Sequence, residues 1–203
     1  MKWLIETLLR RRAKRLIQFI LPDLPATGQI LDVGSGTGHN AHSLTNASPL
    51  TVIEADVVDL HSIGPGPILF DGTVLPFRDA EFSASILLFV LQYTANPESL
   101  LRETRRVTSG RVMVLQSTYV GKIGHLVLTA WDFLTGRCPL FVAGALGLVN
   151  SNTTSLHPQR FFTRQSLESI LNASGFQIHS TRRLDAIGIF IRRELYVLEP
   201  TAT

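Results

Sequence analysis

Apolar side chains recur with helical spacing in the first segment of the chain. Between residues 3 and 21 they return every three or four positions and form one face: Ile5, Leu8, Leu9, Ala13, Leu16, Ile17 and Ile20. Arg11, Lys14 and Arg15 fall largely on the other side. Because proline cannot continue a helix, the pattern predicts an amphipathic helix over 3–21 that ends by Pro22.

Short apolar runs then alternate with helical patterns. The runs predict strands within 28–36, 50–57, 67–70, 83–92 and 110–117, and the periodic segments predict helices starting at 39 and over 96–107 and 163–176. Two prolines and two glycines between Asp56 and Asp71 leave little room for a helix there. Two β-like runs joined by "DAIG" (185–188) predict a terminal hairpin. We therefore expect an α/β fold with a mostly parallel sheet and an antiparallel closing hairpin.

Composition limits the class of protein. The 203 residues are 45% hydrophobic and 17% charged, which suits a single domain over 1–203. The apolar run 138–149 is shorter than the roughly 20 residues of a membrane-spanning helix. Cys138 is the only cysteine, so the chain has no internal disulfide and no cysteine-based zinc site, and we expect no metal. No secretory signal pattern precedes the domain, which favours the cytoplasm.

A glycine turn follows the first predicted strand in "LDVGSGTGHN" (31–40). Gly34, Gly36 and Gly38 are spaced G-x-G-x-G between a strand and a helix, a position where the backbone approaches a nucleotide-like ligand closely. A dinucleotide site would need glycine at His39. An acid after the second strand suits a ribose diol, and either Asp56 or Glu54 has workable spacing.

Three further segments extend this pattern. Asp32 precedes the glycines, "FDGTVLPF" (70–77) leads into the fourth strand, and "LLRETRRVTSGRVMV" (100–114) leads into the fifth. Together they resemble class I S-adenosylmethionine-dependent methyltransferases, within them the UbiE-like or methyltransferase type 11 subgroup, over about residues 28–117. Ser83 and Ser109–Gly110 depart from the pattern, as does the missing helix after the second strand.

The resemblance implies a Rossmann-like three-layer α/β/α sandwich with a seven-stranded sheet, and S-adenosyl-L-methionine as cofactor. Asp32 would contact the amino-acid end of the cofactor, Asp71 the adenine amino group, and Phe89 and Val90 would lie near the sugar and sulfonium. For the ribose, Asp56 is favoured over Glu54, because "ADVVD" (55–59) resembles the family's strand end. The implied cofactor-binding residues are Asp32, Gly34, Ser35, Gly36, Thr37, Gly38, Glu54, Asp56, Asp71, Gly72, Thr73, Phe89 and Val90.

Methyl transfer from a sulfonium depends mainly on alignment, so no catalytic triad is expected. The polar candidates beside the reacting atoms are Gln92, Tyr93 and His157. Residues 118–160 lie where the family inserts a substrate lid, and their bulky apolar side chains suit either a hydrophobic acceptor or core packing.

We expect a small-molecule acceptor and no nucleic acid, because no base-reading aromatic pattern accompanies the arginines. The basic side of the first helix is either solvated or a peripheral membrane contact. Two other functions stay open: a non-catalytic methyltransferase-like protein that binds a membrane or partner, and, disfavoured by His39, an NAD(P)-dependent oxidoreductase.

Overall fold

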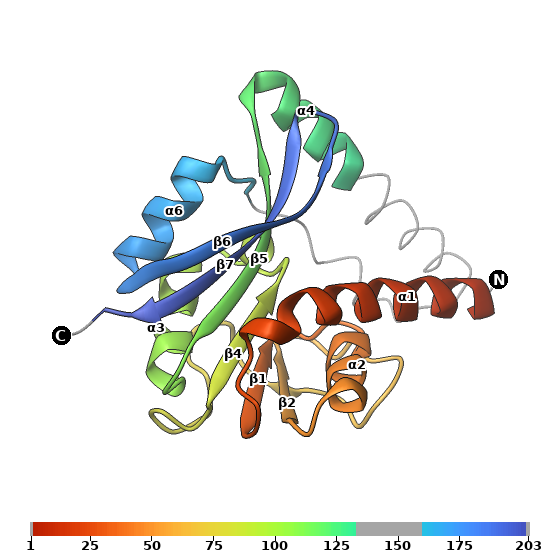
Figure 1. Ribbon diagram of the computed structural model, residues 1–203, viewed down its shortest axis with the longest axis vertical. Helices are drawn as coiled ribbons and strands as arrows, with labels where there is room; N and C mark the ends of the chain where they lie inside the picture. The colour runs from red at the N-terminus through yellow and green to blue at the C-terminus, as the bar shows by residue number, and fades with distance from the viewer. Residues whose placement is uncertain (1, 133–159, 202–203) are drawn as a thin grey trace.

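A computed structural model, which describes residues 2–132 and 160–201, contains one seven-stranded sheet flanked by helices (Figure 1). The strands are β1 (Gln29–Val33), β2 (Thr51–Asp56), β3 (Ile68–Leu69), β4 (Ala84–Leu88), β5 (Val112–Tyr119), β6 (Phe176–Ile187) and β7 (Ile191–Pro200). The helices are α1 (Lys2–Ile20), α2 (His39–Ala47), α3 (Pro97–Val107), α4 (Gly121–Asp132) and α6 (Arg164–Ala173), with short 3-10 turns at Leu21–Asp23 and Leu91–Tyr93.

The strand order is β3-β2-β1-β4-β5-β7-β6. The first five strands are parallel, and β7 pairs antiparallel with both β5 and β6. The order reverses between β1 and β4, and in open α/β sheets ligands bind beyond the carboxyl ends of the strands at such a point. The predicted sheet and closing hairpin are thus confirmed.

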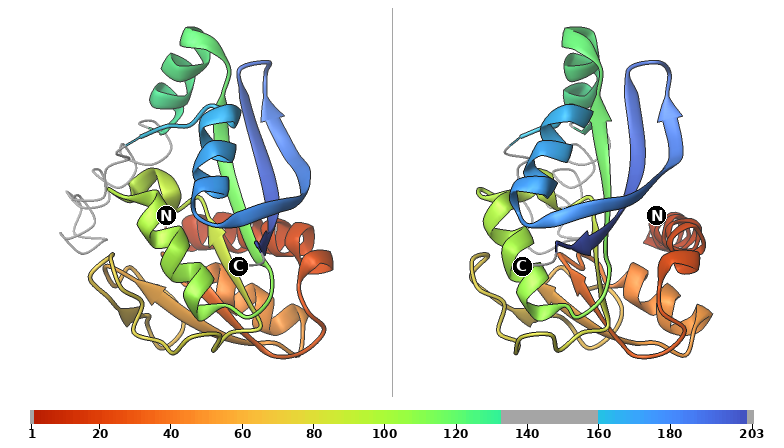
Figure 2. Two further views of the ribbon diagram at one scale, coloured as in Figure 1. Left: turned by 90° about the vertical axis from the view of Figure 1, so that its left-hand side faces the viewer. Right: turned by 60° about the vertical axis from the view of Figure 1, so that its left-hand side comes forward.

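Helices cover both faces of the sheet and make it three-layered (Figure 2). On one face α1 and α2 pack on a core that includes Leu16, Ile30 and Ile86. On the other, α3 and α6 pack on a core that includes Leu101, Leu167 and Tyr196. The central strands β1, β4 and β5 are buried on both faces, which explains their continuous apolar runs in the sequence.

Several predicted boundaries shift. The run 83–92 leaves the sheet after Leu88, because Phe89 adopts a left-handed backbone conformation (φ 63°) and a 3-10 turn follows. The "DAI" of the predicted hairpin connection belongs to β6, so the turn is formed by residues 188–190. Thr163 caps α6 as predicted, since its side chain accepts a hydrogen bond from the Ser166 N–H.

The predicted lid over 118–160 is only partly visible. Its first residues complete β5 and form α4, and residues 133–159 lie outside the described part of the chain. No helix in the described ranges has the length and apolar character needed to cross a bilayer.

Candidate functional site

The glycine turn after β1 is tight, and only one of its three glycines has free space beside its Cα atom. Gly34, Gly36 and Gly38 all have positive φ, at 73°, 60° and 79°. A Cβ at Gly34 would lie 2.6 Å from a Val90 methyl carbon, and one at Gly38 would lie 2.5 Å from the Ile63 carbonyl oxygen. A Cβ at Gly36 would meet no described atom within 4 Å. The outer glycines therefore allow close packing, whereas Gly36 borders open space.

That open space is a cavity of about 610 Å³ at the carboxyl edge of the sheet, within the usual range for small-molecule sites. Its walls come from the ends of β1, β2 and β4, from the loops that follow the strands, and from α1, α2 and α3. Ten of the predicted cofactor residues line it: Gly34, Ser35, Gly36, Thr37, Asp56, Asp71, Gly72, Thr73, Phe89 and Val90.

Two carboxylates mark what we call the acidic end of the cavity, formed by Asp56, Val57, Asp71, Gly72 and Thr73. Asp56 ends β2, and its oxygens accept hydrogen bonds from the Gly36 N–H (2.8 Å) and the Val57 N–H (2.7 Å). Burial raises the pKa of Asp56, and these N–H groups oppose that rise. Asp56 thus stabilises the glycine turn, and its carboxylate oxygens can still accept further hydrogen bonds from a ligand.

Asp71 forms a self-capped turn at the same end. Its carboxylate accepts from the Thr73 hydroxyl (2.6 Å), the Thr73 N–H (2.8 Å) and the Val74 N–H (3.0 Å). These bonds, led by the one from the hydroxyl, lower the pKa of Asp71 to about 2. The side chain is therefore a fixed anion over the pH range of most proteins.

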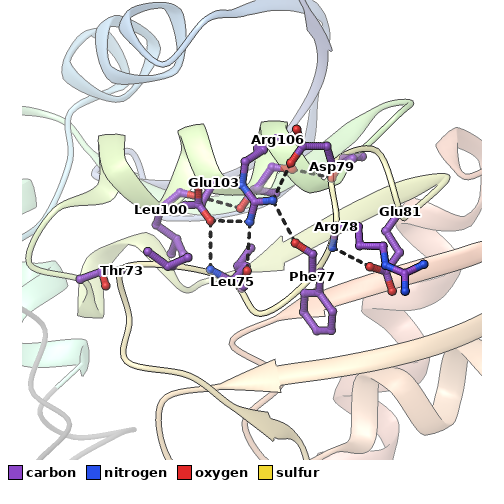
Figure 3. Close-up of polar contacts among 12 residues, drawn as sticks. Thr73, Leu75, Phe77, Arg78, Asp79, Glu81, Leu100, Glu103 and Arg106 are labelled. Carbon is purple, nitrogen blue, oxygen red and sulfur yellow. Dashed lines mark hydrogen bonds and ion pairs between the residues drawn. The ribbon is translucent and has the colours of Figure 1, made fainter.

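The segment that follows Asp71 is clamped to α3 by an ion-paired network (Figure 3). Glu103 accepts from the Leu75 N–H at 3.0 Å, and Arg106 donates to the Leu75 and Phe77 carbonyls at 3.0 and 2.9 Å. Arg106 also pairs with Glu103 and Asp79, and its hydrogen bond lowers the pKa of Glu103. Glu103 and Arg106, which belong to the segment 100–114 quoted in the sequence analysis, thus position the acidic end from outside the cavity.

Three predicted cofactor residues do not line the cavity: Asp32, Gly38 and Glu54. Glu54 contacts the His61 Nε2 at 2.8 Å, so of the two acids proposed for the ribose, Asp56 is the one at the cavity. Asp32 is 1% exposed, and within the described ranges neither of its oxygens has a hydrogen-bond partner. Burial, and then the charges of Glu54 and Asp56, raise the pKa of Asp32 well above its usual value.

The opposite end of the cavity is formed by Leu9, Arg12, Ala13, Phe89 and Tyr93, which we call the α1 end. The strand order places it on the β4 side of the glycine turn and the acidic end on the β2 side. Sequence reasoning missed the contribution of α1. A usable signal was present, because Arg12 follows Leu9 by three residues and precedes Leu16 by four, within the apolar face of the helix.

The three catalytic candidates are separated. Tyr93 lines the cavity. Gln92 is buried outside it and accepts a hydrogen bond from the Gln116 side chain at 2.9 Å. His157 lies outside the described residues. In the part of the chain that the structure describes, no three His, Cys, Asp or Glu side chains form a metal-binding group.

The cavity fits a nucleoside with an amino-acid end. Asp56 and Asp71 offer acceptors for hydroxyl and amino groups, and Gly36 leaves room against the backbone. The buried Ser35 hydroxyl, at the cavity wall, has no hydrogen-bond partner among residues 2–132 and 160–201. The N-terminus of α2 borders the same wall through Thr37, His39 and Asn40, and helix N-termini attract carboxylates.

A family model described as a methyltransferase domain matches residues 5–181. An uncharacterized methyltransferase of Mycolicibacterium gilvum (strain PYR-GCK) is 28% identical over 117 residues, which cover 53% of this chain and 46% of that protein. The alignment therefore spans about half the length of that relative.

Solved methyltransferases share the fold. An S-adenosylmethionine-dependent methyltransferase from Methanosarcina mazei superimposes with a TM-score of 0.63 at 17% identity, covering 91% of this chain and 98% of that one. The magnesium protoporphyrin IX methyltransferase from Synechocystis PCC 6803, solved with bound S-adenosylhomocysteine, gives 0.58 at 16%, covering 93% and 82%.

Proposed function

The chain belongs to the methyltransferase domain family of S-adenosylmethionine-dependent, class I enzymes, and we propose that it methylates a small acceptor with an apolar body. The observation that carries the proposal is the cavity, where polar and charged groups gather at the acidic end and carbon-rich side chains at the α1 end. Membership of the UbiE-like subgroup remains a prediction.

At the acidic end, Asp56 would accept from the ribose hydroxyls and Asp71 from the adenine amino group. Both carboxylates are already held by backbone N–H groups, so little side-chain ordering accompanies binding. The backbone at Gly36 and the N-terminus of α2 would receive the amino-acid end. When bound, S-adenosylmethionine would supply a methyl carbon on a positively charged sulfur. An acceptor lone pair would form the new bond to that carbon in line with the C–S bond, which breaks and leaves S-adenosylhomocysteine as a neutral thioether.

The acceptor would lie at the α1 end. Leu9, Ala13, Leu88 and Phe89 form an apolar wall there, which excludes water and aligns a carbon-rich molecule. Tyr93 lines this end together with Arg12, and we propose that the Tyr93 side chain orients the accepting atom.

Calorimetry and a thermal-shift panel test the cofactor first. We expect S-adenosylmethionine and S-adenosylhomocysteine to raise the unfolding temperature and NAD(P) to leave it unchanged. Stabilisation by NAD(P) alone would indicate the oxidoreductase instead. Incubation with methyl-labelled cofactor and a fractionated lipid and small-molecule extract then tests transfer, and binding without any methyl incorporation would favour the non-catalytic alternative.

We also propose a cytoplasmic protein that contacts anionic membranes through α1. Trp3, Leu4 and Leu8 are 78%, 55% and 57% exposed in its first half. Arg11 and Lys14 are exposed in its second half, and apolar anchors beside basic residues suit an anionic lipid surface. Arg15, predicted with them, instead pairs with Asp185 at 3.0 Å.

Cosedimentation with vesicles tests this contact. We expect binding to phosphatidylglycerol vesicles that weakens with salt and is lost in Trp3→Ser/Leu8→Ser, with Ile123→Ser on α4 as the control for an exposed apolar residue. Equal binding to neutral phosphatidylcholine vesicles would reject the electrostatic part, and no binding to either would reject the contact.

A further inference from the structure

Arg12 is a cation at the wall of the proposed acceptor site. Its guanidinium carbon lies 5.4 Å from the centroid of the Phe89 ring, and both side chains line the cavity with Tyr93. The side chain is accessible from the cavity, although the helix around it is packed on the sheet. Phe89 itself is held by its left-handed backbone, which turns the chain at the end of β4.

No carboxylate pairs with Arg12 in the described ranges, whereas two other arginines of α1 do have carboxylate partners. Arg10 pairs with Glu6 at 2.8 Å, and Arg15 pairs with Asp185. Asp185, in turn, is also bound by Arg193 from β7. Asp185, the carboxylate beside this part of α1, is therefore already paired with Arg15 and Arg193.

The surroundings of Arg12 disfavour its charge. The protein around the cavity and then the charge of Arg193 lower the pKa of Arg12. A cationic sulfonium bound in the same cavity would add to this repulsion. An anion beside Phe89 would relieve it, and a guanidinium forms paired hydrogen bonds with a carboxylate.

We propose that Arg12 binds a carboxylate of the acceptor, so that the substrate has an apolar body and an anionic head. This inference rests on the proposed function. In the proposed arrangement the carboxylate of the cofactor would lie on the other side of the glycine turn, at the N-terminus of α2 beside Thr37 and Asn40. Arg12 lies by Phe89 on the β4 side, and its anion would come from the second substrate.

Binding of small aromatic acids to the complex with S-adenosylhomocysteine tests the inference. The probes are benzoate, 4-hydroxybenzoate and 3,4-dihydroxybenzoate, each compared with its neutral amide by calorimetry or saturation-transfer NMR. We expect at least one acid to bind about 10- to 100-fold more tightly than its amide. Absence of any such preference across the panel overturns the proposal.

Substitutions on α1 test whether the preference for acids over amides depends on Arg12. Arg12→Gln should abolish it, Arg12→Lys should retain part of it, and Arg11→Gln, one position away and not among the residues that line the cavity, should leave it unchanged. Thermal unfolding of each variant checks the fold. An equal preference in Arg12→Gln and the unsubstituted protein also overturns the proposal.

Cofactor affinity separates the two sources of a carboxylate. S-adenosylhomocysteine and 5′-methylthioadenosine, which lacks the amino-acid end, should each bind Arg12→Gln within about twofold of the unsubstituted protein. A loss of affinity for the first ligand alone would assign Arg12 to the cofactor and overturn the proposal. Failure of the unsubstituted protein to bind S-adenosylhomocysteine would instead count against the proposed function.

Discussion

The two ends of the cavity differ in whether their charges are already satisfied. At the acidic end, Asp56 and Asp71 each accept hydrogen bonds from their own loops. At the α1 end, Arg12 has no carboxylate partner within the described chain. A preorganised end suits a ligand that is always the same, the cofactor, whereas an end with an unpaired cation depends on the second substrate. Substitutions should therefore affect the two ends separately.

The glycine turn joins the two ends, and its disruption should have the largest effect. Gly34→Ala would place a Cβ 2.6 Å from the side chain of Val90 at φ 73°. We expect a loss of about 2–4 kcal/mol in the free energy of unfolding and no measurable binding of S-adenosylhomocysteine. Denaturant unfolding and calorimetry measure the two effects.

Gly64→Ala is the matched control, because its φ is 87° and its Cβ would come no closer than 3.9 Å to another group. This substitution introduces the same backbone strain without a steric clash. We therefore expect the free energy of unfolding to fall by about 1–2 kcal/mol and cofactor binding to be unchanged. Similar losses in both variants would show that the contact between β1 and β4 contributes little.

Asp56→Asn should lower the affinity for S-adenosylhomocysteine about 10- to 100-fold, because charge-assisted hydrogen bonds to the ribose are lost while the amide oxygen can still accept from Gly36. Glu54→Gln, two residues earlier on β2, should change it less than about threefold, since Glu54 faces His61. If isothermal titration showed a larger loss of affinity for Glu54→Gln than for Asp56→Asn, the ribose would be assigned to Glu54 instead.

Arg106→Gln tests whether the acidic end depends on its clamp. It removes donors to the Leu75 and Phe77 carbonyls, so we expect about 3- to 10-fold weaker binding of 5′-methylthioadenosine. The preference of the α1 end for acids over amides should persist. Arg102→Gln, whose ion pair with Glu98 is exposed, is the control. Equal losses at both ends would show that they are not separate.

The sequence was sufficient for the sheet and the acidic end, because both depend on local patterns. Apolar runs, glycines at positive φ and an acid at the end of β2 lie close together in the chain. The α1 end joins Arg12 to Phe89 across 77 residues, and its geometry depends on packing of α1 against the sheet. The partner of Glu54 and the isolation of Asp32 likewise arise from tertiary contacts that no periodicity encodes.

Asp32 gives the smallest predicted effect, and its sign is opposite to the others. Its folded-state pKa is raised by burial and by Glu54 and Asp56, so ionisation destabilises the fold as pH rises above the unfolded value near 4. Asp32→Asn should therefore stabilise the protein at pH 7 by about 1 kcal/mol, or roughly 2–4 °C, and the gain should vanish toward pH 4. The exposed Glu98→Gln should show no such pH-dependent gain. A loss of S-adenosylhomocysteine affinity in Asp32→Asn would instead support the predicted contact with the amino-acid end of the cofactor, and would bring the acidic residues of β1 and β2 into one binding surface.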